Sequence, residues 1–164
     1  MTQIRPAAPE DASAICAIWN PIIRDTTITF TTREKTAGEI AEMIVHCKAA
    51  NRQFLVAQEE AGRVTGFATV APFRGGPGYA RTLELSVHLV PEARGKGTGR
   101  ALIAALEKDA AAQGIHSLIS GISAENPDAI AFHERLGFRE IGRLPEVGRK
   151  FDRWIDLVLL QKFL

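Results

Sequence analysis

The sequence is short of cysteine, of net charge and of long apolar runs. Its only two cysteines, Cys16 and Cys47, form no Cys-x-x-Cys pair, which excludes a disulfide framework and a cysteine-based metal or redox site. No stretch approaches the ~18 apolar residues of a membrane-spanning helix, and residues 1–11 lack the apolar core of a signal peptide, so we expect a cytoplasmic protein. The formal net charge of +1 gives no overall attraction to nucleic acid or membrane, so any anion binding must be local.

The remaining composition is that of an ordinary globular domain. Hydrophobic residues make up 46% and charged residues 24% of the 164 residues, and no repeat or low-complexity linker interrupts them, which predicts a single domain over residues 1–164. Periodicity predicts a mixed order, first an antiparallel meander and then strands that alternate with helices. This order indicates an α+β sheet with helices on both faces. The expected helices are 9–22, 40–50, 99–113 and 126–137, and the expected strands are 3–7, 52–59, 63–73, 80–90, 117–123, 138–143 and 153–163.

A glycine-rich segment precedes the third predicted helix. The sequence VPEARGKGTGRALI, residues 90–103, alternates glycine with cationic residues, although glycine is costly to order at a helix start. The first amides of a helix have no partner within it, and glycine leaves them open to a phosphate, which the helix dipole also favours. The segment therefore predicts a diphosphate site. Its residues are Arg94, Gly95, Lys96, Gly97, Thr98 and Gly99.

The spacing of these glycines excludes two familiar phosphate loops. A Walker A loop needs glycine at position 90 and serine or threonine at position 97, where the chain has Val90 and Gly97. A dinucleotide fingerprint needs a last glycine at position 100 or 102, where the chain has Arg100 and Leu102. The pattern that fits is Arg-x-x-Gly-x-Gly, at 94–99. A turn without function is the alternative, and three glycines that weaken a helix start argue against it.

This pattern resembles the coenzyme A loop of the GNAT superfamily of N-acetyltransferases. IRPAAPEDASAI resembles the opening of that family and NPDAIAFHERLGF its second cofactor segment, so the resemblance extends over almost the whole chain. NPIIRDTTITFTTRE, LELSVHLVPEARGKGTGRAL and VGRKFDRWIDLVLLQK are similar to phosphinothricin and methionine sulfoximine N-acetyltransferases. Those enzymes acylate the α-amine of small amino acids.

The resemblance implies a GNAT-like α+β fold. Its central twisted sheet would be largely antiparallel, with one splayed parallel strand pair and helices on both faces. Acetyl-CoA is the implied cosubstrate, and no metal is implied. The pantetheine arm would enter between the strands at 80–90 and 117–123 and pair with free backbone, as an added strand does. The implied cofactor contacts are the backbone of Val87, His88 and Leu89, the segment 94–99, and Asn126.

Glu84 is the general base that the resemblance implies. Strand periodicity places Glu84, Ser86 and His88 on one face, and a polar face on a central strand is typical of a lined cleft. A free α-amine has a pKa of about 7.7–8.0, so a carboxylate that removes its proton assists the attack. The structural alternative is a half-exposed carboxylate paired with Arg81 or another cation.

His133 occupies the place where many GNAT enzymes carry a tyrosine that protonates the departing sulfur. The only tyrosine, Tyr79, lies elsewhere in the chain. An imidazolium with an ordinary pKa near ~6.5 would donate a proton to a thiolate, so His133 is the second predicted catalytic residue. The alternative is that His133 only closes the pocket or orients water.

The acceptor is expected to lie opposite the cofactor, under a lid formed by the threonine-rich segment 25–34. An arginine would suit its carboxylate or phosphinate, because the planar guanidinium donates two hydrogen bonds. By resemblance alone, Lys150 and Trp154 reach the site across the interface of a homodimer, with which the apolar strand at 153–163 is consistent. The predicted acceptor contacts are Phe30, Phe73, Arg74, Arg81, Glu84 and Ser86.

The leading hypothesis is an acetyl-CoA-dependent N-acetyltransferase. It would act on the α-amine of a small amino acid or analogue by direct attack in a ternary complex. The alternatives are a protein or polyamine N-acetyltransferase on the same fold and a non-catalytic acyl-CoA-binding sensor domain. A polyamine needs an acidic pocket, a protein substrate needs an open groove, and a sensor does not need Glu84. No nucleic-acid or membrane partner is expected.

Overall fold

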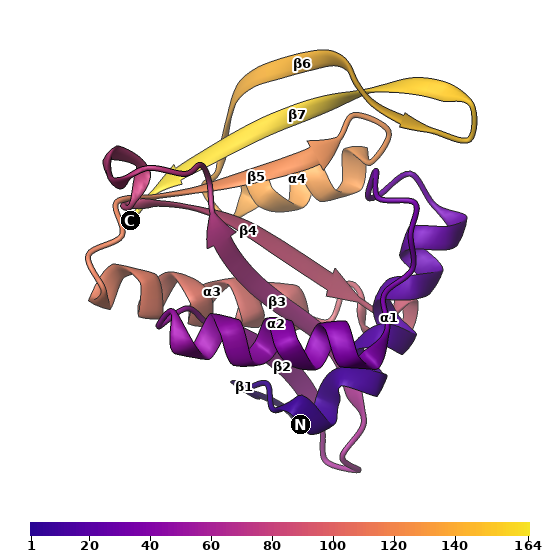
Figure 1. The fold of residues 1–164 in the computed structure, drawn as a ribbon, viewed down its shortest axis with the longest axis vertical. Helices are drawn as coiled ribbons and strands as arrows, with labels where there is room; N and C mark the ends of the chain where they lie inside the picture. The colour runs from indigo at the N-terminus through magenta and orange to yellow at the C-terminus, as the bar shows by residue number, and fades with distance from the viewer.

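Seven strands form one mixed sheet in the computed structural model, which describes residues 1–164 (Figure 1). Their order in the sheet is β1-β2-β3-β4-β5-β7-β6. The pair β4 and β5 is parallel, and all other neighbours are antiparallel. The strands are β1 Thr2–Pro6, β2 Phe54–Glu59, β3 Val64–Pro72, β4 Thr82–Leu89, β5 Ser117–Ser123, β6 Arg139–Lys150 and β7 Arg153–Phe163.

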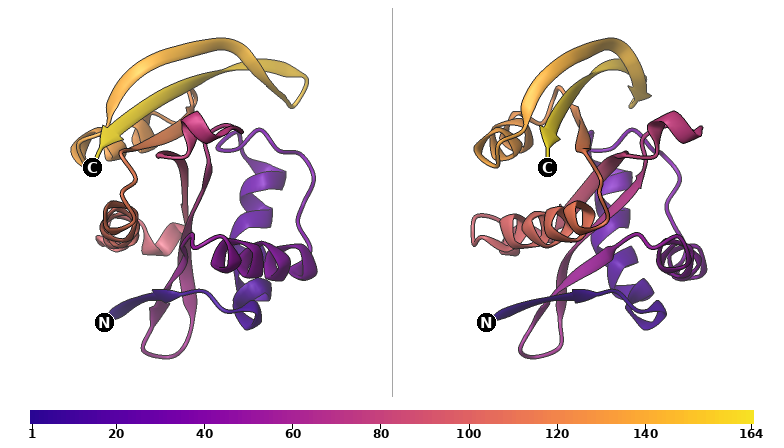
Figure 2. Two further views of the ribbon diagram at one scale, coloured as in Figure 1. Left: turned by 60° about the vertical axis from the view of Figure 1, so that its left-hand side comes forward. Right: turned by 90° about the vertical axis from the view of Figure 1, so that its left-hand side faces the viewer.

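Four α-helices cover the two faces of this sheet. Helices α1 and α2 lie on one face, and α3 and α4 lie on the other (Figure 2). This confirms the predicted α+β class. None of the helices is long and apolar enough to cross a bilayer. The helices are α1 Ala12–Asp25, α2 Ala37–Ala49, α3 Thr98–Ala112 and α4 Pro127–Arg135, and short 3-10 turns occur at η1 Pro9–Asp11, η2 Pro77–Tyr79 and η3 Pro91–Ala93.

Local polar contacts fix where the first two helices begin. Arg5 donates two hydrogen bonds of 2.8 Å to the carboxylate of Asp11, which also accepts from the amide of Ala8. The Arg5 guanidinium holds the pKa of Asp11 below its usual range. At α2, Thr36 and Glu39 form a reciprocal capping box that satisfies amides at the helix start. Between these helices, residues 26–36 form an irregular loop that lies at the functional site described below.

Strand β6 is longer than the strand predicted at 138–143. It continues to Lys150 and pairs with β7 across two register shifts, one between Glu140 and Gly142 and one between Leu144 and Gly148. Glu146 has a φ of 51° within this stretch. Bulges of this kind break the period-two alternation of side chains. The sequence pattern therefore ends earlier than the strand does.

His88 of β4 packs beneath α1. Its ring centroid lies 5.6 Å from that of Trp19 and 5.3 Å from that of Phe67. Burial, and secondly the positive charge of Arg94, lowers the pKa of His88 from 6.5 to about 4. The folded protein therefore holds this imidazole neutral over a pH range in which the unfolded chain binds a proton.

This difference predicts a loss of stability on acidification. Between pH 6.5 and 4 the unfolded state binds more protons at His88 than the native state does, so the free energy of unfolding falls as the pH falls. We expect His88→Phe to remove up to about 3 kcal/mol of this pH dependence. Denaturant unfolding at a series of pH values measures it. His46→Gln, at an exposed position of α2, is the control, and an unchanged slope for His88→Phe would contradict the prediction.

Candidate active site

A cavity of about 360 Å³ opens where β4 and β5 separate. The two strands are in register over three residue pairs only, from Thr82–Ser117 to Glu84–Ile119. Figure 1 shows them side by side where they begin and apart where they end. The cavity walls come from the loop at 28–31, β4, β5 and α4. Of the residues predicted from the sequence, Phe30, Glu84, Ser86, Val87, His88, Asn126 and His133 line it.

The separation leaves one side of β4 without a strand partner. The carbonyl of Arg81 accepts a hydrogen bond from the amide of Ser117, so the backbone groups of odd-numbered residues point toward β5. Beyond Glu84 there is no strand pairing on this side. The amides and carbonyls of Val87 and Leu89 therefore face the gap, where an extended ligand can pair with them.

The cavity passes through the sheet and has a different character on each face. A Cβ at Gly121 would lie 3.4 Å from Oε1 of Glu84, so Gly121 and Glu84 share the face that carries the loop at 28–31. Leu118 and Ile122 pack in the core under α3, so the alternate residue Ser120 points to the face that carries α3 and α4. The two faces meet in the gap between β4 and β5.

Glu84 is a carboxylate without a partner. Burial alone raises its pKa, and no cation contributes to the shift. The expected alternative, an ion pair with Arg81, does not form: Arg81 donates instead to the carbonyls of Gln113 and Gly114, at 2.9 and 3.2 Å, after the end of α3. Glu84 is thus an available proton acceptor at the cavity wall.

His133 is buried on α4 and neutral in its resting state. Its Nδ1 lies 2.8 Å from the carbonyl of Ala129, and its ring packs edge-on against Phe132 and Phe138. Burial lowers the pKa of His133, and the Ala129 hydrogen bond offsets this only in part. A neutral ring that donates from Nδ1 carries a lone pair on Nε2. The lowered pKa disfavours the imidazolium expected from the sequence, and the role of His133 as the proton donor stays a prediction.

The predicted diphosphate loop forms the start of α3. Gly95 and Gly97 have φ of 72° and 84°, and an added Cβ at either would meet no atom within 4 Å, so the loop is open. The first amide with an α-helical partner is that of Ala101, which donates to the carbonyl of Gly97. The preceding amides of the helix are left without such partners. Gly99 allows α3 to pack closely against α4, because an added Cβ there would lie 3.1 Å from the ring of Phe132 on α4.

Asn126 lies at the start of α4, on the other wall of the gap. Its Oδ1 accepts a hydrogen bond of 3.3 Å from the amide of Ala129 and so caps the helix. Its side-chain NH₂ group has no partner in the protein and belongs to a residue that lines the cavity. Asn126 therefore offers a hydrogen-bond donor to a bound ligand.

The structure does not bring the predicted acceptor-binding cations to the cavity. Phe73 and Arg74 lie in the β3–β4 loop, where Arg74 covers the ring of Phe73 at 5.4 Å, and neither lines the cavity. Arg81 is occupied at the end of α3, as described. Lys150 is 4% exposed and donates to the carbonyl of Thr29 in its own chain at 2.8 Å, whereas Trp154 is 57% exposed. The cavity is thus lined by no arginine or lysine.

Ser120 and Gly121 are among the cavity residues that the sequence analysis does not identify. Ser120 is 2% exposed, and its hydroxyl has no hydrogen-bond partner in the protein. A buried hydroxyl without a partner is costly, so Ser120 has a free hydrogen-bonding group to offer to a molecule in the cavity. The only signal in the sequence is a serine and a glycine between the apolar residues in the middle of this strand.

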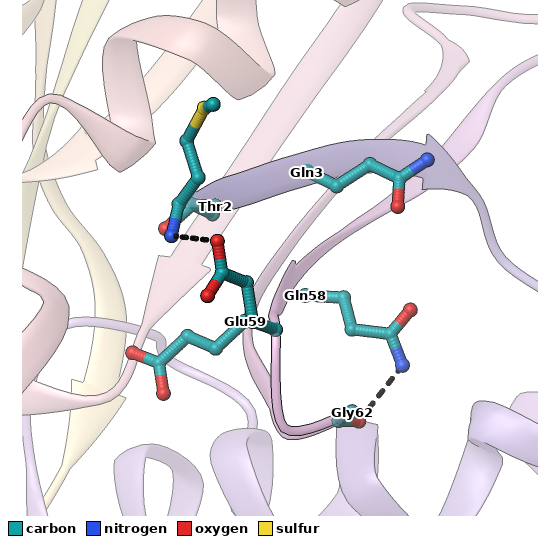
Figure 3. Close-up of a pocket in the computed structure, with 7 residues that line it drawn as sticks. Thr2, Gln3, Gln58, Glu59 and Gly62 are labelled. Carbon is teal, nitrogen blue, oxygen red and sulfur yellow. Dashed lines mark hydrogen bonds and ion pairs between the residues drawn. The ribbon is translucent and has the colours of Figure 1, made fainter.

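A second hollow, of about 510 Å³, lies at the sheet edge far from these residues (Figure 3). It is formed by Thr2, Gln3 and the β2–β3 turn, with Gln58 donating to the carbonyl of Gly62 at 2.8 Å. It is larger, but only one of its seven lining residues is hydrophobic, and it contains none of the predicted site residues. No group of three or more His, Cys, Asp or Glu side chains is arranged to hold a metal ion anywhere in the chain. The cavity between β4 and β5 is therefore the candidate active site.

Comparisons with known proteins agree with this geometry. The family model for the acetyltransferase (GNAT) domain matches residues 4–159. The chain is 38% identical over 161 residues to an L-methionine sulfoximine/L-methionine sulfone acetyltransferase of Pseudomonas paraeruginosa. The aligned residues cover 96% of this chain and 92% of that protein.

Two solved structures superpose on the whole fold. A phosphinothricin acetyltransferase of Sinorhizobium meliloti in complex with AcCoA has a TM-score of 0.94 at 31% identity, over 99% of this chain and 88% of that one. A ribosomal-protein-alanine N-acetyltransferase of Brucella melitensis has a TM-score of 0.94 at 38% identity, over 99% of both chains. The chain therefore belongs to the GNAT family of acetyltransferases.

Proposed function

We propose that this protein transfers the acetyl group of acetyl-CoA to the α-amine of a small amino acid or analogue of the methionine sulfoximine or phosphinothricin kind. The observation that carries the proposal is the cavity through the sheet. It has an unpaired carboxylate, Glu84, on one face, Asn126 at the start of α4 on the other, and the free backbone of Val87 in the gap between them. A direct transfer between two substrates bound on opposite faces needs this arrangement. Residues 1–164, joined by one sheet, would act as a single domain.

The donor side has groups that fit coenzyme A. The open loop at 94–99, with Arg94 and Lys96 exposed, offers backbone amides and positive charge to a diphosphate. The free backbone of Val87 and Leu89 would pair with the amides of pantetheine, and the NH₂ group of Asn126 would donate from the opposite wall. The orphan hydroxyl of Ser120 would gain a partner in the same gap. When bound, acetyl-CoA supplies the activated acetyl group.

The acceptor side has the base. We propose that Glu84 removes a proton from the α-amine, whose nitrogen then forms a bond to the thioester carbonyl carbon. As the C–S bond breaks, its electron pair remains on sulfur, and the second proton, which the nitrogen loses as the amide forms, passes through water to the thiolate. Glu84 then releases its own proton to solvent. Backbone amides of the Val87–Leu89 stretch would stabilise the carbonyl oxygen. His133, neutral and with a lone pair on Nε2, would orient water or substrate rather than serve as the acid.

A second candidate function is acetylation of a protein N-terminus. The likeness to the ribosomal-protein-alanine N-acetyltransferase of Brucella melitensis favours it. Against it stands the loop at 26–36, which is fixed to the body of the protein and closes the acceptor side, whereas a peptide needs an open groove. We therefore propose a small amino acid, rather than a protein N-terminus, as the acceptor.

We also infer a cytoplasmic homodimer. The thiols of Cys16 and Cys47 are both free, as is usual in a reducing compartment. The β6–β7 hairpin carries exposed apolar side chains that a second copy of the chain would cover. Because no arginine or lysine lines the cavity, the cation for an anionic acceptor would come from Arg74 or from the second copy. The exposed apolar residues are Ile141, Leu144, Val147, Phe151 and Trp154.

The base is tested by Glu84→Gln. We expect kcat for acetylation of methionine sulfoximine, followed by thiol release, to fall by about 10²–10⁴-fold, because amide cannot accept the proton. Since the pKa of Glu84 is raised, the acid limb of the wild-type pH profile should lie above pH 4.5 and disappear in the variant. Glu42→Gln, at an exposed position of α2, is the control. Unchanged turnover by Glu84→Gln would contradict the role of Glu84 as the base. The proposed substrate class is tested separately, by wild-type turnover of methionine sulfoximine, phosphinothricin and other amino acids.

The cofactor loop is tested by two glycine variants with matched backbone strain. Gly97 has a φ of 84° at the start of α3, and Gly62 has a φ of 83° in the β2–β3 turn. Alanine costs about 1–2 kcal/mol in this conformation at either site. We expect Gly97→Ala to weaken coenzyme A binding at least about fivefold in calorimetry, while Gly62→Ala lowers only stability. Equal coenzyme A affinity in both variants would place the diphosphate elsewhere.

The dimer is tested by Trp154→Glu. A buried carboxylate in an apolar interface is costly, so we expect this variant to sediment as a monomer where the wild type sediments as a dimer. Val45→Glu replaces an equally exposed apolar residue, 56% against 57%, on α2 and should leave the dimer intact. A monomeric wild type at micromolar concentration would remove the proposal.

A further inference from the structure

We infer that the β6–β7 hairpin sets the depth of the acceptor side of the cavity, and that Gly148 is the positioning residue through which it does so. The inference rests on the proposed function, because it assigns the acceptor to the face that carries Glu84 and Phe30. It names a residue that touches neither substrate. Three observations carry it.

The first observation is the packing of Phe30 against the backbone of Gly148. A Cβ at Gly148 would lie 2.3, 2.5 and 2.7 Å from Cδ2, Cε2 and Cγ of Phe30. Real Cβ atoms do not approach other atoms so closely, so the Phe30 ring occupies the space that a side chain at 148 would need. Phe30 also lines the cavity. The main chain of β6 therefore supports a wall of the site from behind.

The second observation is the adjacent contact of Lys150. Along β6, Gly148 and Lys150 are the two buried positions, and period-two alternation places them on the same face. The ammonium group of Lys150 donates to the carbonyl of Thr29 at 2.8 Å and has no carboxylate partner. A buried cation that donates to one loop carbonyl holds that carbonyl strongly. Both buried positions of β6 thus hold residues 29 and 30.

The third observation is that both ends of the same loop are tied to α1. The hydroxyl of Thr26 donates to the carbonyl of Ile22 at 2.6 Å. At the other end, the side-chain amide of Asn20 exchanges two hydrogen bonds of 2.9 Å with the backbone of Lys35. With its ends on α1 and its middle on β6, the loop is a preformed wall rather than the lid expected from the sequence. A small displacement at Gly148 therefore moves Phe30 into or out of the cavity.

The experiment compares Gly148→Ala with Gly142→Ala. Both glycines lie in β6 at negative φ, but an added Cβ at Gly142 meets nothing within 4 Å. We expect Gly148→Ala to raise the KM for methionine sulfoximine about fivefold or more and to leave the KM for acetyl-CoA within about twofold, because only the acceptor wall moves. Gly142→Ala should change neither constant. Equal effects of the two variants on the acceptor KM would overturn the inference.

A double-mutant cycle separates repositioning of Phe30 from a general loss of structure. Phe30→Ala removes the ring that the new methyl group displaces, so Gly148→Ala should have no further effect on the acceptor KM in that background. A further rise of the same size in the double variant would show that Gly148 does not act through Phe30. The double variant also relieves the clash, and so remains available if Gly148→Ala alone does not fold.

Amide hydrogen exchange gives a readout that does not depend on the acceptor. Without substrates, the amides of residues 28–31 should exchange faster in Gly148→Ala than in the wild type. Their exchange rates should be unchanged in Gly142→Ala. If they do, and yet the wild type acetylates none of the small amino acids, the proposed function fails while the support of the loop by β6 stands. If exchange at 28–31 is unchanged in Gly148→Ala, the support itself is refuted.

Discussion

The pairing of β4 with β5 ends after Glu84, and the rest of the site depends on that ending. Backbone groups that would otherwise be used within the sheet are left free at Val87 and Leu89. The gap lets two ligands that bind opposite faces of the sheet meet without passing around an edge. It also places the carboxylate of Glu84 on one strand beside Gly121 on the other, where no side chain occupies the neighbouring space. A fully paired sheet would have none of these properties.

The electrostatics of the site follow from which groups lose water. Burial raises the pKa of Glu84 and lowers the pKa values of His88 and His133. Each shift favours the neutral form of the side chain. For Glu84 this favours proton uptake from a substrate amine. For the two histidines it means that the net charge of the cavity is set by one carboxylate. The positive charge of the region lies outside, on the loop at 94–99, where the negative end of coenzyme A would be held.

Sequence reasoning predicts the parts of the fold whose side chains repeat with a regular period. The hairpin of β2 and β3, the helix after the glycine segment and the polar face of β4 are all recovered, because their patterns are local. The long β6 is not, since bulges at Gly142 and Gly148 break the alternation. The hydrogen bonds of Arg81 to Gln113 and Gly114 are not predicted, because these partners are more than thirty residues away in the chain.

The chemistry of the candidate site is less predictable than its location. The lowered pKa of His133 comes from burial, which arises only when α4 packs in the folded protein and Phe138 lies against the imidazole ring. Ser120 lies in a strand that is buried on both faces and therefore shows no alternation of polar and apolar residues. No sequence pattern marks Ser120 as a site residue, and only the folded structure shows that its hydroxyl lacks a partner. Whether a polar group in such a strand is satisfied is a three-dimensional property. Family resemblance does not supply it either.

The contact between Phe30 and the bare main chain of Gly148 has a consequence for divergence within the family. Support from backbone does not depend on which side chains the same strand presents to the outside. The outward residues of the hairpin, such as Leu144 and Val147, are therefore free to drift or to adapt to new neighbours while the reaction chamber keeps its dimensions. The outer face of the hairpin and its support of the cavity wall can therefore change independently.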